Sequence, residues 1–553
     1  MKRFIEISLA LATVLLPACD ALDTRMDLSM TDEMMDTRYY QMFDWGYRVY
    51  EYIPYGFSAI DGNLFAGVTD EAQYVTTVSS TQRFNEGSWN IYTNPDEKYS
   101  SYFNGIYAAH NYLDKSVDYK YILGRNRDTL TSNGYDSYYR DIDDVKRLRA
   151  ESHVLKAYYY LELMKRYGGV PIINKAYSDP AEANLPRGTV DDVIDLIVNE
   201  IESVKLDLVI DWNAISQSDR DGRITRGVAL AIKSRALLYA ASPLFNPEND
   251  KTKWEKAASA AYEVMNMNLY SLDPSYQKLF TTDYTNTSPE TIWAIRQGAT
   301  NDFERANYPI GTPGGGSGIC PTQNLVDAYE YKGEQTDDPY ENRDPRFYYT
   351  IVRNGDSWNG RTMEIYPGGT DDPSNTNASP TGYYLRKFLN ENLNLTNDAA
   401  EIRSWIVFRY AEILLNFAEA MNEAYGPDDA HGYGMTAREA VNAVRARADV
   451  GMPPVDVPSG DVAAMRDAIK HERQIEFAFE DHRWWDLRRW EDAGDVLNSP
   501  VRGVRVTQDG DGFQYTYFDV ANRVFEAPKM NLYPIAQEEI VKSGNVLTQN
   551  PGW

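Results

Sequence analysis

One stretch of the chain, residues 145–167, has an apolar pattern that constrains the fold class more than any other feature. Its residues recur on one face of a helix at spacings of three or four, namely Leu148, Ser152, Leu155, Tyr159 and Leu163. Gly168 and Gly169, followed by Pro171, end the helix, because glycine disfavours helical conformation and proline cannot donate the backbone hydrogen bond that would continue it. The pattern therefore predicts a long helix that ends at Tyr167.

Similar helical patterns follow on both sides of the chain's centre. They cover residues 189–208, 225–241, 253–266, 409–424, 436–449 and 461–490. The earlier helices have faces rich in alanine and tyrosine. In successive helices of about 15 to 20 residues, a face of small side chains can pack against a face of large ones. This predicts antiparallel helix pairs stacked like tetratricopeptide repeats, although the spacing of the helices is too irregular for a clean repeat. The fold class is therefore mostly α, with a few short strands.

Residues 269–403 differ in character from the helical parts. They are dense in Asn, Asp, Thr, Gly and Pro, and contain one strand-like run at 291–295. Long irregular stretches in a compact protein usually bind something or are disordered, and the many embedded aromatic rings argue against disorder. We expect a loop-rich, ligand-facing region between two helical parts, 37–268 and 404–553, within a single domain of residues 37–553.

Residues 1–18 have the layout of a secretory signal peptide, with basic residues ahead of an apolar run. The run, residues 4–16, is too short to span a bilayer, which takes about 20 apolar residues. Cys19 follows the small residue at the cleavage site, so the segment resembles a bacterial lipobox, although Pro17 is unusual at its position. An ordinary signal peptide with a chance cysteine is the alternative. We expect Cys19 to be acylated and residues 19–36 to form an acidic tether.

Composition narrows the classes of partner. A formal charge of −27 repels phosphate backbones and acidic lipid surfaces, so no nucleic-acid partner is expected, and the membrane is reached only through the lipid anchor. With Cys19 acylated, Cys320 has no cysteine partner, and we expect no intramolecular disulfide. The 42 tyrosines and 11 tryptophans suit contacts that are half apolar and half hydrogen-bonded.

Catalytic patterns are incomplete throughout the sequence. No pair of histidines has the His-x-x-x-His spacing of a zinc site, and the glycine run 314–318 lacks the Lys-Ser/Thr ending of a phosphate loop. Nothing marks a histidine partner for Cys320, which we interpret as a small buried thiol. Among 82 acidic residues, paired carboxylates are too frequent to show whether the protein is a glycoside hydrolase. A glycoside hydrolase therefore stays the alternative to a non-enzyme.

Two acidic pairs offer oxygen ligands for a cation. Asp70-Glu71 and Asp371-Asp372 both lack the loop spacing of an EF-hand, and we interpret them as solvated surface. We expect no cofactor, and a structural calcium, although compatible with such ligands, is not indicated.

Residues 473–490 alternate carboxylates and guanidinium groups among large rings. Glu476 and Glu480 share a helix face, so they could be read as a catalytic acid and base. The interpretation that we favour is structural, with the carboxylates paired to buried arginines while Phe479 and the tryptophans fill the core. This stretch resembles the C-terminal signature of the SusD/RagB family, the surface glycan-binding lipoproteins of Bacteroidetes nutrient-uptake systems.

Other segments match patterns of the same family in the same order along the chain. They are residues 148–151 with 167–171, 321–328, 409–420 and 547–553. The resemblance implies a helical fold with tetratricopeptide-like pairs, an irregular ligand-facing region, no catalysis, and pairing with a SusC-like TonB-dependent transporter. In the family, acidic residues after the acylated cysteine resemble a surface-export signal, which implies a lipid-anchored protein exposed at the cell outer membrane.

The function that we expect is capture of an oligosaccharide or polysaccharide without bond chemistry, followed by delivery to the transporter. Sugar rings present C–H faces that stack on aromatic rings, while their hydroxyls need amides and carboxylates. A peptide-binding, RagB-like component is the competing class, because tyrosine-rich surfaces suit peptides equally well.

The resemblance also suggests where the ligand is held, since SusD-like proteins use aromatic rings from a loop before an early helix and from the irregular middle. By context, the candidates are Trp89, Asn90 and Tyr92, which precede a helix expected at 99–113, and Phe303, Tyr308 and Trp358 in the middle region. The polar turn around Trp358 predicts a ring that faces outward. A packed ring is the alternative for each, and Trp293, inside an apolar run, is expected in the core.

Overall fold

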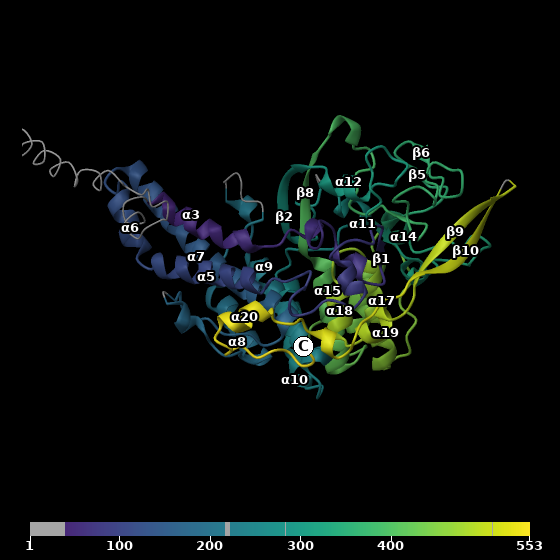
Figure 1. Cartoon of the computed structure of the whole chain (residues 1–553). Coiled ribbons are helices and arrows are strands. Elements are labelled where there is room, and N and C mark those ends of the chain that lie inside the picture. The colour runs from purple at the N-terminus through teal and green to yellow at the C-terminus, as the bar shows by residue number, and fades with distance from the viewer. Residues whose placement is uncertain (1–38, 178, 216–221, 282–283, 511) are drawn as a thin grey trace, which may run out of the picture. The chain divides into compact units, whose positions relative to one another are not determined.

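The computed structural model describes residues 39–553 except 178, 216–221, 282–283 and 511 (Figure 1). The predicted signal peptide, Cys19 and tether lie outside the described residues. The chain divides into two compact units. The smaller consists of Met1–Trp45 and Lys115–Val145, and the larger of Gly46–Asp114 and Lys146–Trp553. The predicted boundaries inside 37–553 stay predictions.

The described part of the smaller unit is helical. It contains the first part of α3 (Tyr40–Arg48), α6 (Tyr119–Asn126) and the first part of α7 (Ser132–Tyr167). Arg127 follows α6 and pairs with Asp141 of α7 at 2.7 Å, while its guanidinium lies 4.5 Å from the centre of the Tyr39 ring. One arginine therefore ties the three segments of this unit together.

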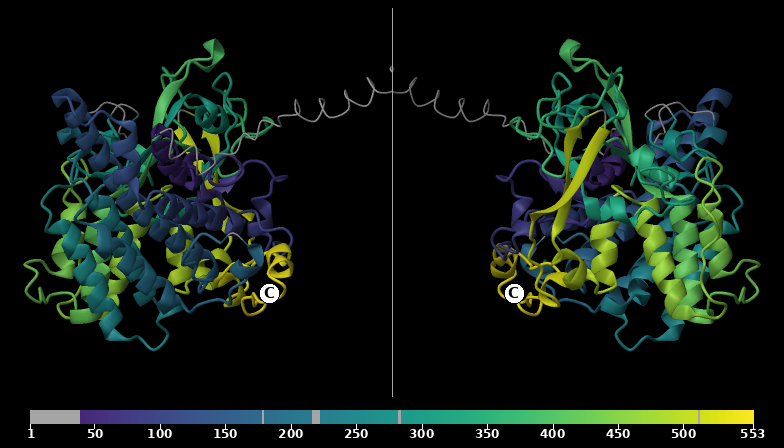
Figure 2. Two further views of the ribbon diagram at one scale, coloured as in Figure 1. Left: turned by 90° about the vertical axis from the view of Figure 1, so that its left-hand side faces the viewer. Right: turned by 90° about the vertical axis from the view of Figure 1, so that its right-hand side faces the viewer.

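The larger unit is built on the helices that the sequence pattern predicts. Its main helices are α5 (Tyr99–Lys115), the rest of α7, α8 (Val190–Val204), α9 (Arg226–Ala241), α10 (Lys251–Met265), α15 (Tyr410–Tyr425), α16 (Ala437–Arg445), α17 (Val462–Glu476) and α18 (Arg483–Arg489). Helix α10 packs against α9 and α15, and α15 packs against α16 and α17. The right-hand view of Figure 2 shows these last helices side by side. The mostly α-helical fold class is confirmed.

Side chains at the helix starts explain several of the boundaries. Thr189 and Asp192 form a capping box at α8, and Thr436 and Glu439 form another at α16. The Thr225 side chain accepts a hydrogen bond from a backbone N–H of α9. These caps satisfy donors that the first turn of a helix leaves free, which is why each helix begins where it does.

Shorter elements connect the main helices. The short α-helices are α4 (Gln82–Asn85), α11 (Tyr276–Leu279), α12 (Asp302–Asn307), α13 (Gln323–Ala328), α14 (Pro345–Thr350), α19 (Ala493–Leu497) and α20 (Gln537–Lys542). The 3-10 turns are Val49–Tyr52, Gly56–Ser58, Phe65–Val68, Pro180–Ala183, Trp212–Ala214, Pro243–Phe245, Leu395–Asn397 and Lys529–Asn531. None of the helices within the described ranges has both the length and the apolar character of a bilayer-spanning segment.

The strands form separate two-stranded antiparallel sheets. The pairs are β1 (Ala72–Tyr74) with β3 (Ile319–Pro321), β2 (Thr291–Thr300) with β8 (Glu401–Arg409), β4 (Ile351–Val352) with β7 (Tyr384–Leu385), β5 (Ser357–Trp358) with β6 (Arg361–Thr362), and β9 (Val501–Asp509) with β10 (Gly512–Ala521). The predicted strand at 291–295 is confirmed as part of β2. Trp293 is buried as predicted, and its indole N–H donates to the Gly222 carbonyl at 2.8 Å.

The β9–β10 ribbon was not predicted and extends away from the rest of the larger unit in Figure 1. Its sequence signal is short. Val504 and Val506 are buried while Arg505 between them is exposed, which is the alternation of a half-buried strand. A ribbon of two strands has little buried surface, so this alternation is confined to a few residues and is easily missed.

The predicted helix 461–490 is wrong as one continuous element. Helix α17 ends at Glu476 and α18 begins at Arg483, and Phe479 and Asp481 between them have positive φ of 65° and 62°. Such values are unfavourable for residues with a Cβ and persist only where surrounding contacts fix them. Glu480, which lies between these two residues, makes the contacts that do so.

Those contacts belong to a buried ion-pair network, as the sequence interpretation favours. Glu476 pairs with Arg409 at 2.6 Å, Arg447 at 2.7 Å and Arg346 at 2.8 Å. Glu480 pairs with Arg409 at 2.7 Å. Burial would raise the pKa of Glu476, but the three guanidinium groups hold it well below its ordinary value. The network therefore joins α17, β8, α14 and the segment after α16.

We expect Glu476→Ala to destabilise the protein by about 3–5 kcal/mol, because it leaves buried guanidinium groups without their carboxylate. The matched control is Glu182→Ala, which breaks the exposed pair of Glu182 with Lys175, 3.3 Å apart with more than half of each side chain exposed. That change should cost no more than about 1 kcal/mol. Chemical denaturation measures both, and equal losses would contradict a structural role for the network.

Candidate functional site

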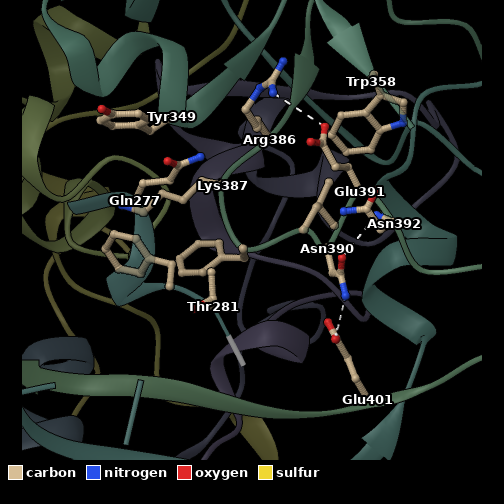
Figure 3. Close-up of a pocket in the computed structure, with 13 residues that line it drawn as sticks. Gln277, Thr281, Tyr349, Trp358, Arg386, Lys387, Asn390, Glu391, Asn392 and Glu401 are labelled. Atoms are coloured by element: carbon tan, nitrogen blue, oxygen red, sulfur yellow. Dashed lines mark hydrogen bonds and ion pairs between the residues drawn. The ribbon is translucent and has the colours of Figure 1, made fainter. Parts of the chain in front are cut away.

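The irregular region of the larger unit carries an open pocket of about 370 Å³ (Figure 3). Aromatic, amide and charged side chains line it together, namely Gln277, Phe280, Thr281, Tyr349, Trp358, Arg386, Lys387, Phe388, Leu389, Asn390, Glu391, Asn392 and Glu401. We call it the Arg386 pocket. Its volume lies toward the lower end of the roughly 300–1,000 Å³ found for small-ligand sites.

Several elements contribute to the Arg386 pocket. Helix α11 supplies Gln277, α14 supplies Tyr349, β5 supplies Trp358, and β8 begins with Glu401. Phe280 and Thr281 follow α11, and the segment 386–392, which follows β7, supplies the remaining lining residues. The pocket thus combines residues more than 100 positions apart, which only the tertiary fold brings together.

One wall of the pocket is aromatic. The rings of Phe280 and Phe388 meet edge to face with centroids 5.2 Å apart. Phe388 has a positive φ of 69°, so the chain is held in an unfavourable conformation at the pocket wall. Tyr349 is half-buried, and its ring stacks on Tyr276 with centroids 6.4 Å apart.

Lys387 fixes the chain beneath this wall. Its ammonium donates to the Tyr276 hydroxyl at 2.7 Å, the Ala478 carbonyl at 2.8 Å and the Glu480 carboxylate at 2.7 Å. Burial lowers the pKa of Lys387 to about 8, although Glu480 acts in the opposite direction. Since Glu480 also pairs with Arg409, Lys387 connects the pocket to the buried ion-pair network.

The rim opposite is charged and polar, as Figure 3 shows. Arg386 lies 3.6 Å from Asp356 and 3.6 Å from Glu391, measured between side-chain nitrogen and oxygen atoms. The Asn390 amide donates to Glu401 at 2.9 Å. These contacts hold the rim side chains in one arrangement before any ligand arrives.

Two further rim side chains are available to a ligand. Gln277 and Asn392 are exposed, and neither side chain makes a hydrogen bond to another described residue. A side-chain amide offers one acceptor oxygen and two N–H donors. The pocket can therefore donate hydrogen bonds to a polar ligand and accept hydrogen bonds from it. Its aromatic wall can contact the apolar surface of the same ligand.

Trp89 does not lie in this pocket, and its ring is not available for stacking. The side chain is only 2% exposed, and its ring contacts Phe84, Tyr533 and Trp553 with centroids 4.6 to 5.2 Å apart. The expectation of an accessible ring is corrected, because the C-terminal residues cover Trp89. Sequence patterns around residue 89 contain no sign of that distant cover.

The aromatic candidates of the middle region are also buried. Phe303, Tyr308 and Trp358 are at most 3% exposed, and Phe303 packs against Phe57 with centroids 4.7 Å apart. The outward-facing ring predicted for Trp358 is wrong, because its indole N–H donates to Thr312 at 3.1 Å inside the core.

Two of these rings nevertheless support the Arg386 pocket. Trp358 contributes to its lining, and Tyr308 meets Trp358 edge to face with centroids 5.3 Å apart. The Tyr308 hydroxyl donates to the carbonyl of Asn390. Sequence context therefore points to the region that carries this pocket, but the Tyr308 and Trp358 rings themselves are buried.

Asn90 and Tyr92 are exposed, with 76% of Tyr92 accessible. The Asn90 side-chain oxygen accepts a hydrogen bond from the Tyr92 backbone N–H at 2.9 Å. Neither residue lines the Arg386 pocket. Their role in binding stays a prediction.

The polar residues of the pocket were missed from sequence. The one available signal is the run Asn390-Glu391-Asn392, in which amides and a carboxylate follow Phe388 and Leu389. Gln277 and Tyr349 belong to short helices without a distinctive pattern, so nothing in the sequence marks them as partners of that run.

The acidic pairs are not simply solvated surface. Asp70 pairs with Arg483 at 2.8 Å, and Asp371 is buried and pairs with Arg361 at 2.6 Å. Glu71 is 1% exposed, and burial together with Asp70 raises its pKa to about 8. Within the described part of the chain, no three or more His, Cys, Asp or Glu residues group as metal ligands.

Cys320 is a buried free thiol, as predicted, and burial raises its pKa to about 12. Its S–H contacts the Ser317 carbonyl at 3.2 Å. A thiol of this kind is protonated at neutral pH, whereas a nucleophilic cysteine needs its thiolate.

Comparison with known protein families covers most of the chain. The SusD family profile matches residues 279–553, and a SusD-like profile, described as starch-binding and associating with the outer membrane, matches residues 22–238. The chain belongs to the SusD family. Apart from Gln277, the lining of the Arg386 pocket lies within the part matched by the SusD profile.

Individual SusD-like proteins are similar over most of their length. SusD-like protein P2 of Formosa agariphila is 26% identical over 75% of both chains. A SusD-like carbohydrate-binding protein of Bacteroides fragilis has the same fold, with 22% identity, a TM-score of 0.74, and coverage of 93% of this chain and 99% of the other. A laminarin-binding SusD-like protein aligns with 21% identity, a TM-score of 0.64, and coverage of 93% and 99%.

Proposed function

We propose that the protein captures an oligosaccharide or polysaccharide in the Arg386 pocket. The observation that carries this proposal is the meeting of an aromatic wall with amide and carboxylate side chains in one open pocket. A sugar ring has apolar C–H faces and hydroxyl edges, so it needs both kinds of surface at once. SusD-like relatives described as carbohydrate-binding and laminarin-binding, and the starch-binding description of the matched profile, support the same ligand class.

In this proposal the aromatic wall and the polar rim contact different parts of the sugar. Tyr349, which is half-buried, covers the face of a sugar ring with the buried Phe280–Phe388 pair behind it, while Gln277 and Asn392 exchange hydrogen bonds with the sugar hydroxyls. The ligand is held without bond chemistry. Product analysis after prolonged incubation with the bound glycan should therefore show intact substrate, and released smaller sugars would favour a glycoside hydrolase.

We expect Tyr349→Ala to weaken glycan binding about three- to tenfold, because one stacked ring contributes roughly 0.5–1.5 kcal/mol. The matched control is Tyr92→Ala, which removes an exposed tyrosine outside the pocket and should leave the affinity unchanged. Calorimetry with a glycan chosen from an array measures both, and a peptide panel run in parallel tests the competing class. A loss confined to Tyr92→Ala would move the site to the loop before α5.

We further propose that acylated Cys19 anchors the protein at the outer-membrane surface, where it delivers the glycan to a SusC-like TonB-dependent transporter. The lipobox-like segment and the outer-membrane association in the family description support this location. Pull-down after gentle solubilisation should recover a transporter with the wild-type protein, whereas Cys19→Ala should leave the membrane fraction. Retention of that variant at the membrane, or recovery of no transporter, would contradict the proposal.

A further inference from the structure

The β9–β10 ribbon carries aromatic rings on one of its faces. Phe513, Tyr515 and Tyr517 alternate along β10, so their side chains lie on the same face of the strand. Phe513 is 39% exposed and Tyr517 42% exposed, while Tyr515 is half-buried. The ring of Phe513 meets the half-buried ring of Tyr366 with centroids 5.4 Å apart. We call Phe513 and Tyr366 the ribbon pair.

A strip of partly exposed charged side chains leads from the Arg386 pocket toward this face. Between side-chain nitrogen and oxygen atoms, Arg386 lies 3.6 Å from Asp356, and Asp356 lies 3.2 Å from Arg353. Arg353 in turn lies 3.8 Å from Asp338. The exposed fractions of these four side chains range from 18% to 46%. We call Asp356, Arg353 and Asp338 the Arg353 strip.

Tyr515 joins the Arg353 strip to the ribbon. Its ring meets the buried ring of Tyr340 edge to face with centroids 5.2 Å apart, and the Arg353 guanidinium lies 5.0 Å from the centre of that Tyr340 ring. Burial raises the pKa of Tyr515, and the charges of Asp338 and Asp356 raise it further, while Arg353 acts in the opposite direction. Charges have this effect only on groups that lie near them. Contacts therefore run without a break from the pocket to the aromatic face of the ribbon.

The strip and the ribbon offer a sugar the same two kinds of contact as the pocket. Among the described residues, the Tyr515 hydroxyl and the Arg353 Nη2 atom have no hydrogen-bond partner, and neither atom is buried. Sugar hydroxyls can accept from the guanidinium and donate to the phenol oxygen. The ribbon pair provides an apolar surface for the C–H face of a sugar ring. A protein partner would suit the rings, but the free polar groups that continue from the pocket favour a glycan.

We propose that a glycan chain bound in the Arg386 pocket continues along the Arg353 strip and stacks on the ribbon pair. This inference rests on the proposed function, and it makes the ligand a chain longer than the pocket alone can hold. The second contact forms within a ligand that is already bound, so it adds affinity at little further entropic cost. Affinity should therefore increase when the chain becomes long enough to reach the ribbon pair.

Calorimetry with oligosaccharides of one linkage and increasing length tests this extension. The shortest members of the series fill only the pocket, and the longest also reach the ribbon pair. We expect the longest members to bind about three- to tenfold more tightly than the shortest, which is the contribution of one stacked ring. Equal affinity for every member that fills the pocket would overturn the inference.

The variant Phe513→Ala makes the test specific to the ribbon. It should weaken binding of the longest oligosaccharides about three- to tenfold and leave binding of the shortest unchanged, because only the former reach residue 513. The matched control is Phe518→Ala, which removes a half-buried phenylalanine from the opposite face of the same strand and should leave both affinities unchanged. Equal losses for short and long ligands in Phe513→Ala would assign the ring to the structure of the protein and refute the inference.

Two further variants separate loss of the ring from loss of ribbon structure. Phe513→Tyr keeps a flat ring and should retain the dependence on ligand length. Phe513→Leu keeps an apolar side chain beside Tyr366 but should lose that dependence, and its retention would refute stacking. If Phe513→Ala binds every oligosaccharide normally but no longer recovers the transporter in the pull-down, the ribbon contacts a protein partner and the inference is wrong.

These outcomes separate this inference from the function on which it rests. If Tyr349→Ala weakens every oligosaccharide but Phe513→Ala weakens none, the pocket binds the glycan and only its extension to the ribbon fails. If no oligosaccharide binds, or Tyr349→Ala has no effect, the proposed site fails and the inference fails with it.

Discussion

The buried pairing of Glu476 with three arginines is the interaction on which the rest of the larger unit depends. Arg346, Arg409 and Arg447 come from α14, the end of β8 and the segment after α16, so one carboxylate fixes elements far apart in the chain. Buried charges of this kind add little net stability compared with apolar residues, but they tolerate only an arrangement in which every partner is present. The network thus specifies the positions of its elements.

The geometry of the Arg386 pocket depends on that network. Glu480 contacts both Arg409 and Lys387, and Lys387 holds the backbone that carries Phe388 and the amide-rich rim. The strained backbone at Phe388 persists because its neighbour is fixed on three sides. A pocket formed in advance loses less conformational freedom when a ligand binds, which would favour the proposed capture of a glycan.

The sequence predicts the helices and the buried ion pairs well, but not the residues that line the candidate pocket. Helical periodicity is local, so α8, α9 and α15 are visible from their own residues. Whether an aromatic ring is exposed depends on residues far away in the sequence. Trp89 and Trp553 lie at opposite ends of the chain, and only their contact in the fold shows that Trp89 is covered. The pocket residues Gln277 and Tyr349 likewise acquire their role only when α11 and α14 meet the 386–392 segment.

The central claim is that a glycan occupies the Arg386 pocket between its aromatic wall and its amide rim. A crystal structure of the mature protein with a bound oligosaccharide tests it most directly. The account predicts electron density for a sugar ring against Tyr349, with hydroxyls within hydrogen-bond distance of Asn392 and Glu391. A sugar bound elsewhere, for instance over Tyr92, with no sugar density in the Arg386 pocket, would contradict it.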